Sequence, residues 1–296
     1  MNLKTIWDLL KETVSEWSKD KVSLLAAALA YYTVFSLAPL LIIVIAIASL
    51  VFESEAVKGE IVGQIQELVG SNGAQFIKTA IENASKPTTR TIASIINLVV
   101  LLFGASGVFA QLQETLNTIW SVQPKPGLGV IKIIQNRFLS FTMVLGIGFL
   151  LLVSLAFGAA LTALFNFLSK SIPGIDFFWQ IANHIFSFVV ITLLFALIYK
   201  VLPDVKLAWS NVSIGAAIAS VLFTIGKSLF GIYLGNSSFS STYGAAGSPI
   251  IVLAWVYYSA QILFFGAEFT KVYTRKYGSQ IFPAENAVTL TESARG

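Results

Sequence analysis

The chain has 296 residues, of which 56% are hydrophobic and 11% charged, and its mean hydropathy of +0.78 is too high for a soluble domain. The net charge is +4. The absence of cysteine excludes a disulfide, a thiolate nucleophile and a cysteine metal site, and the single histidine, His184, excludes a histidine-rich zinc or haem site.

The N-terminal segment, residues 1–22, contains an amphipathic helix over residues 3–19. Its apolar positions recur at helical spacing between charged ones, and they are Leu3, Ile6, Trp7, Leu10, Val14 and Trp17. A helix with two tryptophans and several lysines is suited to lying in the cytoplasmic membrane interface. A soluble cap that packs on the cytoplasmic loops fits the same pattern equally well.

Six long apolar segments follow, and they define the fold class. Each reaches the ~20 residues that an α-helix needs to cross a hydrocarbon core of ~30 Å. The segments are residues 24–52, 91–119, 138–168, 181–202, 212–234 and 250–269. The sequence therefore predicts an all-α, polytopic membrane protein, with six transmembrane helices in one domain over residues 1–277. Pro39, near the middle of the first segment, predicts a kink.

The connection over residues 53–90 is the only long one between apolar segments. Apolar residues recur at helical spacing on both sides of the run Gly70-Ser71-Asn72-Gly73. We therefore expect two short amphipathic helices joined by a glycine turn, which together form a small external cap.

Three of the apolar segments carry polar or small residues along one face. These are Asn97, Gly104, Gly107, Gln111 and Glu114 in the second, Ser213, Ser220, Thr224, Lys227 and Gly231 in the fifth, and Tyr257, Tyr258, Gln261 and Glu268 in the sixth. Ionisable residues at membrane depth usually face the interior of a bundle. Together the three faces predict a hydrophilic seam between these helices.

Structural explanations compete with a functional seam. Lys227 either lines a cavity or extends its ammonium to the outer interface, and Glu268 either lines a cavity or pairs with Lys271 or Arg275. The small residues, including the Gly231-xxx-Gly235 pair, also suit close helix packing. His184 is expected to be a packing or interface residue.

Two further segments are polar. Residues 235–248 are uncharged and rich in glycine, alanine and serine, which suits either a surface loop or the lining of a cavity. Residues 278–296 are polar and lack periodicity, so we expect a disordered cytoplasmic tail.

The distribution of lysine and arginine predicts the orientation. Thirteen of the 19 flank the side of the membrane that holds both termini, five lie on the other side, and Lys227 lies within a segment. The excess places both termini in the cytoplasm. The net charge then suits contact with anionic lipids and requires no nucleic-acid partner.

Three stretches resemble a known family. They are AAALAYYTVFSLAPL (26–40), LPDVKLAWSNVSIGAAIASVLFTIGKSLFGIYL (202–234) and YGAAGSPIIVLAWVYYSAQILFFGAEFTKVY (243–273). The pattern over residues 15–277 is similar to the YihY/virulence factor BrkB family, once mislabelled ribonuclease BN. The resemblance implies a six-span protein of the bacterial inner membrane, linked to envelope integrity and serum resistance, and suspected of moving lipids or lipid precursors.

Three functions remain open. The first is a transporter or flippase for an anionic amphiphile, without cofactors, and without its own ATP hydrolysis because no GxxxxGK[ST] motif occurs. The second is a membrane scaffold for envelope assembly. An enzyme fits less well, because a metal-dependent nuclease needs clustered carboxylates, whereas Glu114, Asp204 and Glu268 lie on separate elements.

Overall fold

The computed structural model describes residues 3–50, 52–84, 91–125, 175–236, 247–278 and 281–290, with scattered positions between 142 and 167. Seven helices have defined bounds: α1 Leu3–Lys19, α2 Val22–Ala48, α3 Ser54–Ala84, α4 Thr91–Ile119, α6 Ile175–Val201, α7 Trp209–Asn236 and α9 Gly247–Tyr277. Four short strands complete the described structure: β1 Val122–Pro124, β2 Val205–Lys206, β3 Phe282–Pro283 and β4 Ala287–Thr289.

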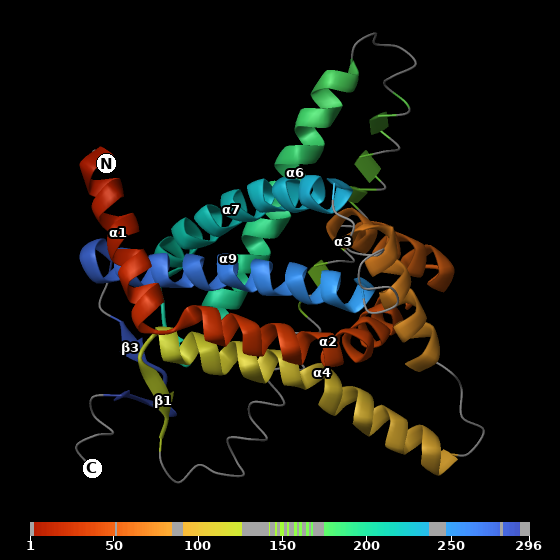
Figure 1. Ribbon diagram of the computed structural model, residues 1–296, viewed down its shortest axis with the longest axis horizontal. Coiled ribbons are helices and arrows are strands. Elements are labelled where there is room, and N and C mark those ends of the chain that lie inside the picture. Colours follow the sequence, from red (N-terminus) through yellow and green to blue (C-terminus); the bar gives the residue numbers. More distant parts are fainter. Residues whose placement is uncertain are drawn as a thin grey trace.

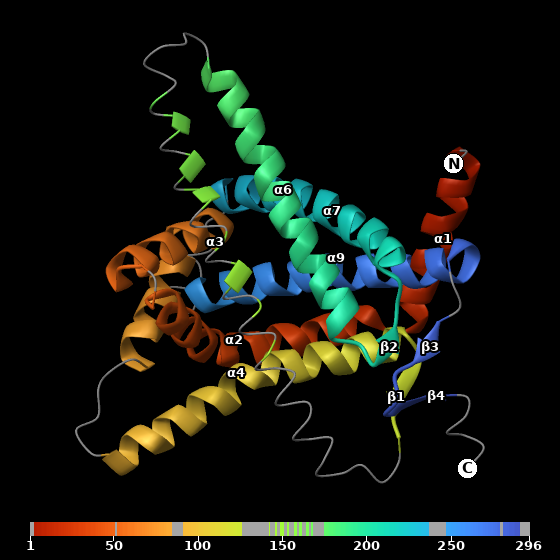
Figure 2. The ribbon, with the colours of Figure 1, turned by 180° about the vertical axis from the view of Figure 1, so that it is seen from behind.

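Helix α9 runs through the middle of the molecule, with α2 and α7 on either side of it (Figure 1). Helix α4 lies along α2, and α6 crosses α7 steeply (Figure 2). Helix α1 and the strands lie at one end of this bundle and α3 lies at the other. Residues 3–19 and residues 54–84 are therefore at opposite ends, as the predicted topology requires.

Small residues allow α6, α7 and α9 to approach closely. A Cβ atom added at Gly266 of α9 would overlap the hydroxyl of Tyr199 and lie 2.7 Å from the Cβ of Ala219. The fully buried Tyr199 donates a hydrogen bond of 2.6 Å to the carbonyl of Leu263. Gly215 of α7 meets Thr270 in the same way. Close packing of this kind is how helices associate in lipid.

Gly231 does not take part in this packing, because a Cβ atom there would meet no atom within 4 Å. The surroundings of its predicted partner, Gly235, are outside the described part of the chain. The small-residue packing predicted at Gly231 is instead found at Gly215, Gly226 and Gly266.

Pro39 lies inside α2, which continues as a helix from Val22 to Ala48. Its ring packs against α4, where a Cβ atom at Gly104 would lie 3.1 Å from Pro39 Cγ. The proline therefore occupies space that a glycine on the neighbouring helix leaves open. A kink at Pro39 stays a prediction.

Four helices within the described residues are long and apolar enough to cross a membrane: Val22–Ala48, Trp179–Val201, Trp209–Tyr233 and Gly247–Tyr277. The predicted second span is a helix, α4, but the side chains of its first nine residues are outside the described set. Most of the predicted third span, 138–168, is also outside it. An all-α membrane protein fits the structure, and the number of six spans stays a prediction.

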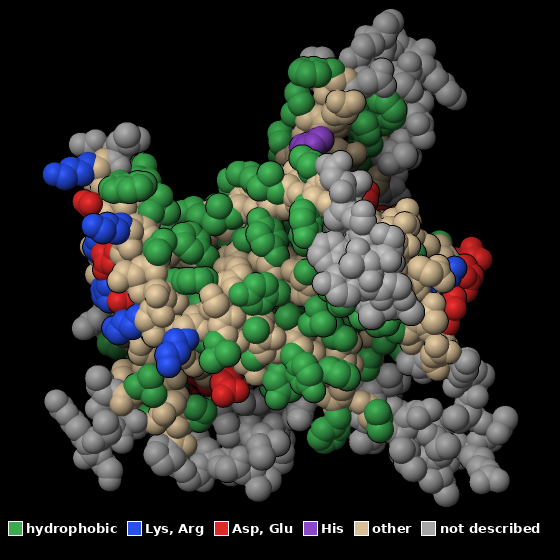
Figure 3. All heavy atoms as spheres, in the orientation of Figure 1, with side chains coloured by type: hydrophobic (Ala, Val, Ile, Leu, Met, Phe, Trp, Pro, Cys, Tyr) green, Lys and Arg blue, Asp and Glu red, His purple; other side chains and the backbone are tan. Residues whose placement is uncertain are grey.

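The surface has the charge pattern of a protein that crosses a membrane. Charged side chains gather mainly over α1 at one end and over α3 at the other, with a broad apolar face between them (Figure 3). Large apolar side chains such as Phe35, Ile225 and Leu229 are exposed. Such a surface is stable in contact with lipid tails, whereas its exposure to water would be unfavourable.

Helix α3 has the two helical segments and the glycine break predicted for the cap, whose external position stays a prediction. Two helical segments meet at Gly70, whose φ of 74° and ψ of 174° interrupt the helical backbone. A positive φ favours glycine, which has no Cβ to clash. The two segments bury Val57, Ile61 and Ile77 against α2 and α9.

The expectation of a disordered tail is wrong for residues 281–290. Strand β3 pairs antiparallel with β2, and β4 pairs antiparallel with β1. The N–H of Ala284 also donates to the carbonyl of Asp204. Backbone hydrogen bonds to the two connecting segments thus order a polar sequence whose strands are too short to show a periodicity.

Candidate functional site

Part of the polar face of α4 is directed away from the predicted seam. Gly107 faces α2, because a Cβ atom there would lie 3.2 Å from Ser36 Oγ. Gln111 donates a hydrogen bond to Thr115 on its own helix, and Glu114 is exposed. The side chain of Asn97 is outside the described residues. Among the described residues, no hydrogen bond joins Gln111 or Glu114 to α7 or α9.

The predicted residues of α9 differ in their environments. Tyr257 is exposed, and Tyr258 is half-buried, with its ring against Gly226 of α7. Gln261 has a buried Oε1 atom without a hydrogen-bond partner among the described residues. Glu268, two turns further along the helix, is fully buried. The polar residues of α9 thus extend from the α3 half of the bundle to the α1 end.

Lys227 of α7 forms an ion pair with Glu67 of α3, with its Nζ atom 2.8 Å from Glu67 Oε2. The side chain of Lys227 is 38% exposed and that of Glu67 is 69% exposed. Thr224, one turn away, donates to the carbonyl of Ser220 on its own helix. Nothing in the sequence indicates that Glu67 is the partner of Lys227, although the predicted cap lies at the same end as this half of the fifth span.

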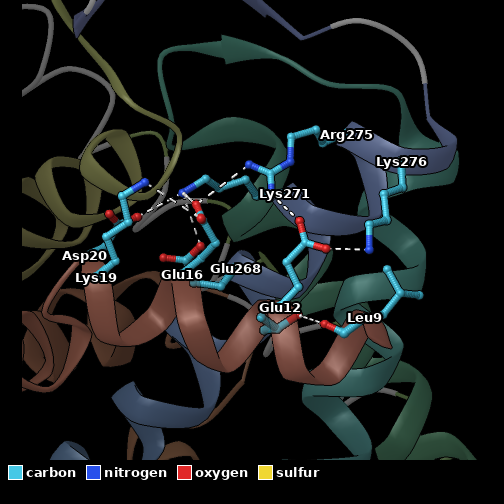
Figure 4. Close-up of polar contacts among 10 residues, drawn as sticks. Leu9, Glu12, Glu16, Lys19, Asp20, Glu268, Lys271, Arg275 and Lys276 are labelled. Carbon is cyan, nitrogen blue, oxygen red and sulfur yellow. Dashed lines mark hydrogen bonds and ion pairs between the residues drawn. The ribbon is translucent and has the colours of Figure 1, made fainter. Parts of the chain in front are cut away.

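A second group of charges joins α1 to the end of α9 (Figure 4). Lys271 Nζ lies 2.9 Å from Asp20 Oδ2, 3.2 Å from Glu16 Oε2 and 3.4 Å from Glu268 Oε2. An ammonium has three N–H donors, so each of the three carboxylates can accept one of them. The predicted pairing of Glu268 with Lys271 is therefore present.

Arg275 and Lys276 extend this contact by pairing with Glu12 of α1 (Figure 4). The hydrogen bond from Lys276, and secondarily that from Arg275, holds the pKa of Glu12 below its ordinary value, although partial burial opposes the shift. Leu9 of α1 is buried against Phe269 and Val272. Of the two interpretations of this helix, the packed cap fits the structure better, with α9 rather than a connecting loop as the element on which α1 packs.

His184 is exposed on α6, and its Nδ1 atom lies 2.7 Å from the carbonyl oxygen of Gln180 in the same helix.

Comparison with known proteins decides the family. The family model described as Virulence factor BrkB matches residues 13–289. The chain belongs to the BrkB family. Its match extends through β4, beyond residue 277, where the sequence resemblance was expected to end.

Relatives of this BrkB-family chain include two proteins named UPF0761 membrane protein. The one from Aeromonas salmonicida is 29% identical over 263 residues, which cover 86% of this chain and 85% of the relative. The one from Alteromonas mediterranea is 30% identical over 273 residues, which cover 89% of this chain and 86% of the relative. No solved structure matches the chain.

The carboxylates considered for nuclease chemistry have other surroundings in this BrkB-family protein. Asp204 accepts hydrogen bonds from Gln113 and Asn117 near the end of α4, at 3.3 and 2.9 Å. Asn117 also accepts one from the backbone N–H of Asp204. Within the described residues, no group of three or more His, Asp or Glu side chains could hold a metal ion. Sequence reasoning missed Gln113 and Asn117, which fix the turn after α6.

Proposed function

We propose that this protein is a transporter or flippase of the bacterial inner membrane, which moves an anionic, amphiphilic envelope lipid or lipid precursor. The observation that carries the proposal is the ion pair between Lys227 and Glu67. It places a cation of an apolar helix next to the surface of the bundle, where a lipid headgroup has access.

Lys227 can exchange Glu67 for another anionic partner, because both side chains of the pair are partly exposed. An exposed ion pair contributes only ~0–1 kcal/mol, so an anionic headgroup can replace Glu67 at little cost. The lysine then keeps an anionic partner, and α3 is released from α7 at this contact. Binding of the headgroup and movement of the cap are coupled in this way.

One further polar group lies in α9. The Oε1 atom of Gln261 is buried and unpaired among the described residues, and in this proposal it accepts a hydrogen bond from a hydroxyl or ammonium of the headgroup when the helices around it separate. The orientation that we propose has α1 in the cytoplasm and α3 outside, in agreement with the lysine and arginine bias.

The test is a lipid-scrambling assay with purified protein. Vesicles of phosphatidylethanolamine and phosphatidylglycerol carry a fluorescent phosphatidylglycerol, and a membrane-impermeant reductant bleaches the outer leaflet only. We expect the wild type and Lys227→Arg to expose the inner-leaflet probe, and Lys227→Met to expose it at least tenfold more slowly, a change of about 1.4 kcal/mol in barrier.

Lys58→Met is the matched control, because Lys58 also pairs with a carboxylate, Glu55, but on the same helix of the cap. It should behave like the wild type. Equal rates for Lys227→Met and the wild type would contradict the role of Lys227. The assay is also run in parallel vesicles that carry an ion gradient. If no variant scrambles lipid in either kind of vesicle, lipid movement itself is contradicted.

A membrane scaffold is the second candidate, and the close packing of α7 on α9 favours it. Gly215 and Gly266 leave no room for even a Cβ atom between these helices, which suits a rigid support. In this case Lys227→Met, at normal abundance in the membrane, would fully restore growth of a deletion strain under envelope stress.

A further inference from the structure

The carboxyl group of Glu268 is buried and only partly paired. Its side chain is fully buried, and its Oε1 atom has no hydrogen-bond partner among the described residues. Its Oε2 atom lies 3.4 Å from Lys271 Nζ, which is longer than an ordinary charge-assisted hydrogen bond. Burying an ionised carboxylate with one oxygen unpaired is costly, and binding of a proton removes the charge.

Lys271 is the only cation within 4 Å of Glu268 in the described part of the chain, and its ammonium is shared. Asp20, which directly follows α1, and Glu16 of α1 lie closer to it, at 2.9 and 3.2 Å. Both side chains are more than four-fifths buried. Three ionised carboxylates around one ammonium would leave uncompensated negative charge in a poorly hydrated place.

The other groups around this cluster do not remove the imbalance. Arg275 lies 3.9 Å from Glu16 and also pairs with Glu12, and Lys19, which lies 3.8 Å from Glu16, is 74% exposed. From α6, Tyr199 donates its hydroxyl hydrogen to the carbonyl of Leu263. From α7, Gly215, Ile218 and Ala219 pack near this part of α9, and none of them carries a charge.

We propose that Glu268 is a proton-binding site, and that release of its proton loosens the docking of α1 on α9. The proton comes from the solution at the α1 end of the bundle and binds the unpaired Oε1 atom. The neutral acid leaves Lys271 to Asp20 and Glu16, so that α1 stays docked. When the proton leaves, Glu268 competes for the same ammonium and repels the two carboxylates of α1.

This inference goes beyond lipid movement and does not depend on it, because a proton can bind in the absence of any substrate. In a transporter the site would link the proton gradient to the position of α1. In a scaffold it would make the α1 surface sensitive to pH.

The first test compares two isosteric substitutions in the purified full-length protein. Glu268→Gln mimics a protonated acid, so we expect no change in melting temperature near neutral pH. Glu16→Gln removes a carboxylate that the proposal keeps ionised, and we expect a fall of roughly 2–4 °C. Equal losses for the two variants would show that Glu268 is ionised and would overturn the proposal.

Infrared spectroscopy provides a direct measurement on the same samples. The carbonyl stretch of a buried carboxylic acid should be present in the wild type near neutral pH, fall at alkaline pH, and be absent from Glu268→Gln. Identical spectra for the two proteins in this region would also overturn the proposal.

The coupling to α1 is tested through Leu9, which is 1% exposed. The chain has no cysteine, so Leu9→Cys gives a single thiol whose alkylation reports undocking of α1. The rate of alkylation of Leu9→Cys is measured at several pH values, once with Glu268 present and once with Glu268→Gln. Dividing the first rate by the second cancels the ordinary pH dependence of a thiol. We expect this quotient to rise at least severalfold with pH. A constant ratio would refute the coupling.

Discussion

Substitution of Gly266 by alanine tests the packing of α6, α7 and α9 most sharply. The added Cβ would overlap the hydroxyl of Tyr199 and lie 2.7 Å from the Cβ of Ala219. Overpacking of this kind costs about 1–3 kcal/mol, against which the helix gains about 0.5–1 kcal/mol from the replacement of glycine. The expected net loss is about 0–2.5 kcal/mol, or a fall of up to roughly 10 °C in melting temperature.

Gly63→Ala in α3 is the matched control, because a Cβ there would meet no atom within 4 Å. It should keep or slightly raise the melting temperature, measured for both variants in the same detergent by intrinsic fluorescence. Adding Tyr199→Phe to Gly266→Ala should recover part of the loss, since the hydroxyl is removed while Ala219 remains. A melting temperature for Gly266→Ala equal to that of Gly63→Ala would refute this description of the packing.

Four further outcomes are expected. The pKa of Glu12 is lower when α1 is docked, so its contribution to docking is present above the ordinary value of 4.5 and is lost as the pH falls through the lowered value; hydrogen exchange of α1 amides should show this acid loosening in the wild type and not in Glu12→Gln. Asp204→Ala should lower the free energy of unfolding by about 1–3 kcal/mol, because buried Gln113 and Asn117 lose a shared acceptor, whereas Glu114→Ala, at an exposed position, should change it by less than about 0.5 kcal/mol. Deletion of residues 281–296 should increase hydrogen exchange in β1 and β2, while deletion of residues 291–296 should leave their pairing intact. A cysteine at Ser71 should react with an impermeant thiol reagent added outside intact cells and one at Ser121 should not; the opposite pattern would reverse the orientation.

The sequence alone predicts the features that depend on neighbouring residues. The periodicity of residues 3–19, the apolar segments and the glycine break at Gly70 all depend on local spacing. The structure has the first helix, the break at Gly70 and four of the six predicted spans. The contact of Glu268 with Lys271 also spans one turn of a helix, and the sequence indicates it directly.

Contacts between distant residues could not be read in this way. Glu67 and Lys227 are 160 residues apart, and Asp20 and Lys271 are 251 apart. Which glycines face a neighbour depends on how each helix is rotated, so Gly231 was favoured where Gly215 and Gly266 make the contacts. Gly104 and Gly107 of α4 face α2 instead of the predicted seam for the same reason, since nothing local places α4 along α2.

The pairing of the last strands has a consequence for the order in which the molecule is completed. A ribosome releases β1 and β2 before β3 and β4, because α7 and α9 are made in between. The carboxylates of Glu12, Glu16 and Asp20 likewise emerge before their partners Lys271, Arg275 and Lys276 at the end of α9. The end of the bundle that holds α1 can therefore close only after α9 and β4 have been made, and a nascent chain that stalls earlier exposes unpaired strands and carboxylates to chaperones and proteases.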